Sequence, residues 1–173
     1  MCSECITDEP HFEYARSYGI YEGAIEEAIK LLKYHGVKRL SRPLSDLLFS
    51  LPLPPVDVII PVPLHGKRLK ERGFNQSAII GRHISRGIGM PLLINSLIRT
   101  RDTLPQVGLN AKDRKRNIKG AFSVQDKKGI YKKRVLLIDD VLTTGSTARE
   151  CSKVLKMAGA KSVYVMTIAY SRK

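Results

Sequence analysis

Several residue types are scarce in this 173-residue chain, and each scarcity excludes a class of protein. Tryptophan is absent and aromatic residues make up only 6%, which argues against a surface on which successive bases of a nucleic acid stack. Three cysteines are too few for a disulfide framework and fit a reducing compartment. No run of eighteen apolar residues and no signal peptide is present, so we expect a cytoplasmic protein without membrane insertion.

Acidic residues are also scarce, since 16 Asp and Glu stand against 30 Lys and Arg and give a formal net charge of +14. The basic residues gather in segments 67–72, 112–119 and 127–134. Such an excess favours an anionic partner such as nucleic acid, a membrane surface or a polyphosphate ligand, although a basic surface without a specific partner is the alternative. The 43% hydrophobic content is enough to build the core of one domain.

Hydrophobic periodicity predicts an α/β fold. The expected helices cover residues 21–35, 42–51, 75–86 and 147–157, and the expected strands cover residues 56–62, 92–98, 131–138 and 162–169. The last strand, helix and strand form a unit whose connection should be a right-handed crossover, which makes the sheet mostly parallel with helices on its faces. Residues 104–121 show no sustained periodicity, and a polar loop of this length suggests a lid over a site.

Two adjacent acids, Asp139 and Asp140, follow the apolar run 135–138. Ligands of open α/β sheets bind beyond the carboxyl ends of the strands, which is where these acids are expected. We expect the chain to be turning already at this point, so that both carboxylates reach one ligand as hydrogen-bond acceptors. Vicinal hydroxyls of a sugar suit such a pair of acceptors.

A loop of hydroxyl residues around Gly145 follows the acids. Thr143, Thr144, Ser146 and Thr147 stand at the expected start of a helix, where backbone N–H groups bind a phosphate monoester. A structural helix cap is the alternative, although it accounts for one hydroxyl rather than for four next to two acids. Acids for ribose beside a phosphate cradle describe a phosphorylated ribose, and no P-loop or dinucleotide-binding glycine motif is present.

The stretch IDDVLTTGST resembles the phosphoribosyl pyrophosphate (PRPP) signature of type I phosphoribosyltransferases. Together with IPVPLHGKRLKERGFNQS, TLPQVGLNAKDRKRNIKGAF and YEGAIEEAIKLLKYHG, it resembles the ComF family of competence-associated phosphoribosyltransferase-like proteins over nearly the whole chain. The resemblance implies a type I phosphoribosyltransferase fold for residues 19–173.

The resemblance also implies roles for individual residues. Asp139 and Asp140 are expected to hold the ribose hydroxyls, while the residues of the following loop hold the 5-phosphate, with Ser146 contributing only its backbone. The residues expected to bind diphosphate are Pro63, Leu64, Lys67, Arg68 and Arg72. For the basic side chains of this set, a solvated helix face is the alternative. Mg²⁺ is expected to arrive with PRPP, held mainly by oxygens of the ligand and water.

The lid residues expected from the family pattern are Gln106, Arg114 and Asn117. Displacement of diphosphate at C1 develops negative charge and requires the exclusion of water, so Arg114 is expected to be catalytic together with the two acids.

Cys2 and Cys5 form half of a zinc ribbon. Family members carry two such pairs, so residues 1–18 are expected to be the truncated remnant of an N-terminal zinc module, and Zn²⁺ is expected only if the missing half is present. His11 is a makeshift third ligand at best, and Cys151 is most simply a core residue.

Two classes of function remain open. The first is an enzyme that transfers phosphoribose from PRPP to an unidentified acceptor with release of diphosphate. The second is a non-catalytic competence factor that senses PRPP or binds single-stranded DNA. The resemblance links both to DNA uptake.

Overall fold

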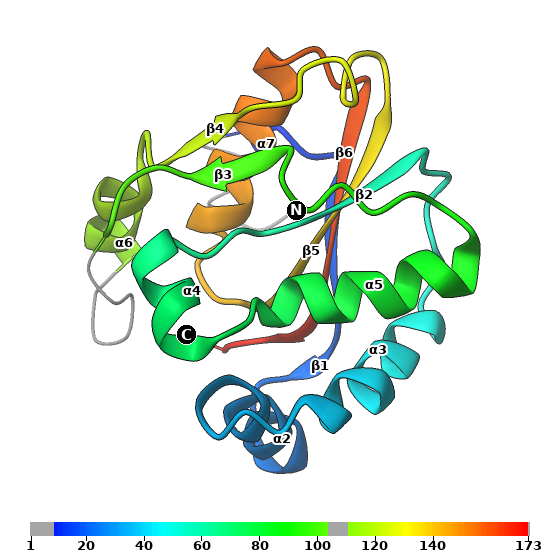
Figure 1. Ribbon diagram of the computed structural model, residues 1–173, viewed down its shortest axis with the longest axis vertical. Helices are drawn as coiled ribbons and strands as arrows, with labels where there is room; N and C mark the ends of the chain where they lie inside the picture. The colour runs from blue at the N-terminus through cyan, green and yellow to red at the C-terminus, as the bar shows by residue number, and fades with distance from the viewer. Residues whose placement is uncertain (1–8, 104–110, 173) are drawn as a thin grey trace.

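The computed structural model describes residues 9–103 and 111–172, except for the side chains of residues 111, 112 and 114. Its centre is a parallel four-stranded sheet with the order β1-β6-β5-β2 (Figure 1). A separate antiparallel pair is formed by β3 and β4. The strands are β1 (Tyr14–Ile20), β2 (Val58–Pro61), β3 (Leu97–Arg99), β4 (Phe122–Val124), β5 (Arg134–Leu142) and β6 (Ser162–Tyr170). The α/β fold with a parallel sheet is therefore confirmed.

Helices cover both faces of the central sheet (Figure 1). Side chains of β5 alternate between two hydrophobic cores, with Val135 and Leu137 facing α7 and Leu136 and Ile138 facing α2, α3 and α5. The helices are α2 (Gly23–Tyr34), a 3₁₀ turn η1 (Lys38–Leu40), α3 (Ser41–Phe49), α4 (Gly66–Arg72), α5 (Gln76–Ile88), α6 (Ala111–Ile118) and α7 (Ser146–Met157). Within the described residues, none of these helices has the length and apolar character needed to cross a bilayer.

Several elements differ from the sequence-based expectation, which had no counterpart for β1, η1 or β4. The expected strand 92–98 is reduced to Leu97–Arg99, with one isolated bridge from Ile59 to Leu92 before it. The expected loop 104–121 contains α6, whose sequence AKDRKRNI lacks an apolar stripe, so periodicity could not reveal it. The short α4 was expected only in the alternative that put the basic side chains on a solvated helix face, and it ends where Gly73 adopts a left-handed φ of 75°.

The first strand crosses the expected boundary between residues 18 and 19. Residues of β1 pair with β6, for example Tyr14 with Tyr164 and Ser17 with Thr167. Residues 14–18 therefore belong to the central sheet. The two cysteines of the expected zinc remnant lie outside the described residues, and the zinc module stays a prediction.

Candidate functional site

A cavity of about 230 Å³ opens at the carboxyl ends of β2 and β5. Its wall combines the ends of α2 and β5, the loop before α7, residues of α4, α5 and β6, and one residue of β3. Segments that are distant in sequence thus meet at one edge of the sheet, because the carboxyl ends of parallel strands lie at the same edge.

Asp139 and Asp140 both border this cavity. The expectation that the chain already turns at the acids is wrong, because β5 continues to Leu142 and Asp139 still pairs with Thr167 of β6. Asp139 Oδ1 accepts hydrogen bonds from Ser77 Oγ at 3.1 Å and from the Asp140 backbone N at 2.9 Å. The carboxylate is therefore fixed by α5 and by its own strand.

Asp140 is held by a lysine that the sequence reasoning missed. Lys33 Nζ of α2 lies 2.8 Å from Asp140 Oδ2, and only 17% and 6% of the two side chains are exposed. In the described part of the chain, no hydroxyl or amide donates to this oxygen, so Lys33 is its counterpart. Burial alone would lower the pKa of Lys33, but the Asp140 carboxylate outweighs it and the pKa is raised.

The pKa of Asp139 is raised to about 7. Burial is the main cause and the neighbouring Asp140 charge adds to it, whereas Lys33 and the two hydrogen bonds act in the opposite direction. Two adjacent carboxylates at a partly dry site are costly to ionise together. Such a site gains from a ligand that donates hydrogen bonds to both.

The loop before α7 supplies the phosphate-type cradle. Gly145 has a φ of 71°, a conformation that favours glycine, and the helix begins at the next residue. Thr143, Gly145, Ser146 and Thr147 border the cavity, whereas Thr144 does not and instead shares a 2.8 Å hydrogen bond with Ser146 Oγ. Backbone N–H groups at this helix end favour an anion.

Four of the five residues expected to bind diphosphate also border the cavity: Pro63, Leu64, Arg68 and Arg72. The side chain of the fifth residue, Lys67, is exposed and is not part of the cavity wall. Arg72 is oriented by a 2.7 Å hydrogen bond from its Nη1 to Gln76 Oε1 and by the ring of Tyr34, 5.6 Å from its guanidinium carbon. These contacts hold a positive charge at the cavity wall.

The expected lid is only partly described. Asn117 lies on α6 and does not border the cavity. Gln106 and the Arg114 side chain lie outside the described residues, so their roles stay predictions.

The sequence reasoning missed several wall or support residues, among them Lys33, Ser77 and Arg99. Lys33 had a sequence signal, because it follows the buried Ile29 by four residues and must lie on the inner face of the helix. Ser77 had none, since Asp139 is distant in sequence, and nothing in the sequence near Arg99 indicated that it borders the same cavity as the acids.

No group of three His, Cys, Asp or Glu side chains suited to a metal ion occurs within residues 9–103 and 111–172. Asp139 and Asp140 can accept hydrogen bonds from a ligand with hydroxyl groups, and Lys33 already neutralises Asp140. The site therefore suits a ligand that binds together with its own cation.

Comparisons with known proteins give relatives in two groups. Competence protein F of Haemophilus influenzae is 36% identical over 97% of this chain and 77% of its own length. DNA utilization protein YhgH of Escherichia coli K12 is 32% identical over 95% of this chain and 75% of its own length. No protein-family model matches the chain.

A solved structure shares the fold. Glutamine PRPP amidotransferase from B. subtilis, solved with ADP and GMP, superposes with a TM-score of 0.52 at 20% identity. The match covers 73% of this chain and 25% of that enzyme, so this chain corresponds to about a quarter of its length. The likeness shows a common type I phosphoribosyltransferase fold.

Proposed function

Because this chain belongs to the competence protein F family, we propose that it binds PRPP in the cavity beside Asp139 and Asp140. The observation that carries the proposal is that two carboxylates, a helix N-terminus and several cationic side chains surround one cavity. Each group suits one part of the ligand: acceptors for ribose hydroxyls, backbone N–H groups for the 5-phosphate and arginines for the diphosphate. The name of the B. subtilis protein, a PRPP amidotransferase, gives the same ligand for a protein of this fold.

The proposed reaction transfers phosphoribose to an acceptor. The bond from C1 to the diphosphate oxygen breaks while the acceptor forms a bond to C1 and loses a proton. Asp139 and Asp140 orient the ribose, and Arg68 and Arg72 neutralise the departing diphosphate. Magnesium bound to PRPP would supply further neutralisation of the diphosphate. Without an acceptor, the same site serves a PRPP sensor.

The proposal is tested by thermal unfolding with Mg²⁺ and PRPP. At a hundredfold excess over Kd, PRPP should raise the melting temperature of the natural chain by roughly 5–10 °C. In the double variant Asp139→Asn with Asp140→Asn this rise should disappear, whereas Asp46→Asn, on an exposed face of α3, should keep it. Equal protection of all three proteins would refute PRPP binding at this site.

Turnover then separates the enzyme from the sensor. We expect diphosphate release when candidate nucleophiles, including bases and amines, are added to the PRPP-bound protein. If PRPP still protects the protein from thermal unfolding but no added nucleophile causes diphosphate release, the result would support a PRPP sensor.

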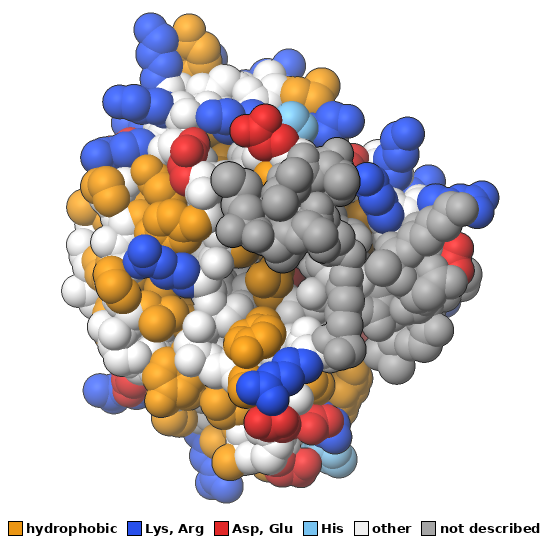
Figure 2. Space-filling view, turned by 180° about the vertical axis from the view of Figure 1, so that it is seen from behind, with side chains coloured by type: hydrophobic (Ala, Val, Ile, Leu, Met, Phe, Trp, Pro, Cys, Tyr) orange, Lys and Arg blue, Asp and Glu red, His pale blue; other side chains and the backbone are white. Residues whose placement is uncertain are grey.

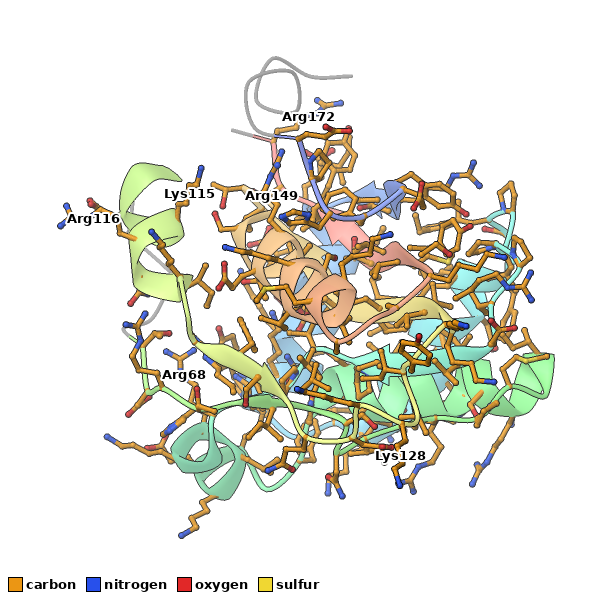
Figure 3. The ribbon with its side chains drawn as sticks, turned by 90° about the horizontal axis from the view of Figure 1, so that it is seen from above. Arg68, Lys115, Arg116, Lys128, Arg149 and Arg172 are labelled. Atoms are coloured by element: carbon orange, nitrogen blue, oxygen red, sulfur yellow. The ribbon has the colours of Figure 1, made fainter. Side chains whose placement is uncertain are left out.

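We propose single-stranded DNA as a further partner because of the basic side chains at a second cavity, and the names of the relatives, competence protein F and DNA utilization protein, agree with it. This cavity measures about 270 Å³ and lies between α6 and α7, and Lys115, Lys119, Arg149 and Lys153 supply basic side chains to its wall. Figure 3 shows Lys115 and Arg149 directed toward this space from the two helices, whereas Arg116 points outward. Glu9 and Glu150 also border it, so its charge is mixed.

The distribution of charge on the surface limits the area available for DNA. Figure 2, the view from behind Figure 1, shows lysine and arginine side chains scattered over this face and along its outline, with acids and hydrophobic side chains between them. A single-stranded DNA site is therefore expected at the second cavity rather than across the whole basic surface.

Salt dependence tests this DNA site. If the cavity contacts phosphates, binding of a labelled oligonucleotide should weaken with salt, and Lys119→Gln with Lys153→Gln should reduce the slope of log K against log salt by about 1.4. Lys128→Gln, at the other end of the molecule in Figure 3, serves as the control. An unchanged slope in the double variant would exclude this cavity.

A further inference from the structure

Two arginines from different elements meet at one residue beside the ribose site. Arg68 Nη2 of α4 donates to the Thr103 carbonyl oxygen at 3.2 Å, and Arg99 Nη2 of β3 donates to the Thr103 hydroxyl. Figure 3 shows Arg68 extending from the side of α4 that faces the rest of the molecule. Both arginines border the cavity that contains Asp139 and Asp140.

In the part of the chain that the structure describes, the guanidinium groups of Arg68 and Arg99 form no ion pair. Arg99 Nε is buried and has no hydrogen-bond partner there. Burial first, and then repulsion from Arg68, lowers the pKa of Arg99, while nearby acidic groups, among them Asp139 and Asp102, act in the opposite direction without cancelling it. Two guanidinium groups without an ion-pair contact at a partly buried wall are costly unless an anion binds to them.

A purely structural role explains only part of this arrangement. Arg99 lies over the ring of Phe122 at 5.6 Å and its bond to Thr103 ties the end of β3, so it stabilises the antiparallel pair. A neutral glutamine would make the Thr103 bond without bringing a second charge beside Arg68. The remaining donors of a guanidinium suit a phosphate or carboxylate, which accepts two parallel hydrogen bonds.

The pair also lies next to the loop expected to bind diphosphate. His65 forms an isolated parallel bridge with Arg99, and Pro63 and Leu64 share the cavity wall. We propose that Arg68 and Arg99, joined by Thr103, form one anion subsite that binds a phosphate or carboxylate group beside the ribose. This inference rests on the proposed function. The anion is either the diphosphate of PRPP or an acidic group of the acceptor.

Calorimetric titrations distinguish these sources. Ribose 5-phosphate and Mg²⁺ diphosphate are each titrated into the natural chain and into the variants Arg99→Gln, Arg99→Lys and Arg68→Gln. The control is Arg86→Gln, which changes an exposed arginine of α5. The PRPP-loaded proteins are then titrated with nicotinate and nicotinamide, which differ by one negative charge. The midpoint of urea unfolding establishes that each variant is folded. If Arg99→Gln does not fold, the titrations of Arg68→Gln test the proposal.

If diphosphate is the anion, Arg99→Gln and Arg68→Gln should weaken its binding by about 10- to 100-fold and leave ribose 5-phosphate unchanged. Arg99→Lys should retain part of the affinity. If the acceptor supplies the anion, the same variants should weaken nicotinate binding but not nicotinamide binding. Titrations that match the Arg86→Gln control in every case would overturn the subsite. Failure of ribose 5-phosphate to bind the natural chain would instead count against the proposed function itself.

Discussion

Replacing Lys33 with Met is expected to lower the free energy of unfolding by about 3–5 kcal/mol. The side chain of Asp140 is 6% exposed, and the Lys33 ammonium at 2.8 Å is its counter-charge. Without Lys33, the carboxylate stays at a site where water cannot solvate it, and no described hydroxyl or amide replaces the lost partner. Urea unfolding at pH 7.5 measures the loss.

Lys30→Met is the matched control for Lys33→Met. Lys30 lies on the same helix and pairs with Glu26 at 2.8 Å, but this pair is exposed to solvent, so its removal should change the stability very little. The double variant Lys33→Met with Asp140→Asn should regain most of the loss, because no charge is then left buried. Equal effects of Lys33→Met and Lys30→Met, or no recovery in the double variant, would contradict a buried ion pair.

Asp139→Asn is expected to stabilise the ligand-free protein by about 3 kcal/mol at pH 8, after a discount for the partial exposure of the site. The folded-state pKa of Asp139 is about 7, well above the ordinary value, so the folded protein holds a proton that the unfolded chain releases. Stability from this group is therefore lost as the pH rises from about 4 to 7. Asparagine is neutral throughout and its oxygen can still accept the bonds from Ser77 Oγ and the backbone of residue 140.

Urea unfolding at pH 5, 6.5 and 8 tests this dependence, and the advantage of Asp139→Asn should grow with pH. Asp57→Asn provides a comparison of opposite sign. Hydrogen bonds from Arg134 lower the pKa of Asp57 to about 2, so its contribution is present above about pH 4 and is lost only as the pH falls toward 2. Asp57→Asn should therefore destabilise the protein at neutral pH. A constant or negative effect of Asp139→Asn between pH 5 and 8 would show that Asp139 is not costly to ionise.

Asp139 is expected to have opposite effects on the stability of the free protein and on ligand binding, which is typical of a ligand-binding site. Its carboxylate is expected to reduce stability in the free protein and to be required for PRPP binding, a conflict common at functional sites. A ribose that donates hydrogen bonds to the acids would relieve this cost.

Local pattern predicted much of the fold. The apolar run ending at Ile138 and the helix after Gly145 were visible because strand and helix periods are properties of neighbouring residues. Helix α6 was not predicted, because its charged sequence has no apolar stripe and only Ile118 of its described side chains is buried. Strand β1 was not predicted either, since its place in the sheet depends on β6, whose paired residues lie 150 positions later in the chain.

The sequence by itself determined the fold class, the two acids and the hydroxyl loop, because these lie within one continuous strand-to-helix segment. Only the tertiary structure decided that Lys33 neutralises Asp140, that Ser77 orients Asp139 and that Arg68 and Arg99 meet at Thr103. The contacts of Lys33 with Asp140, of Ser77 with Asp139 and of Arg68 with Thr103 each join residues tens of positions apart or more, so the packing of helices on the sheet selects these partners. Electrostatics at a buried site depends on distance in space and on exclusion of water, and neither is a property of sequence spacing.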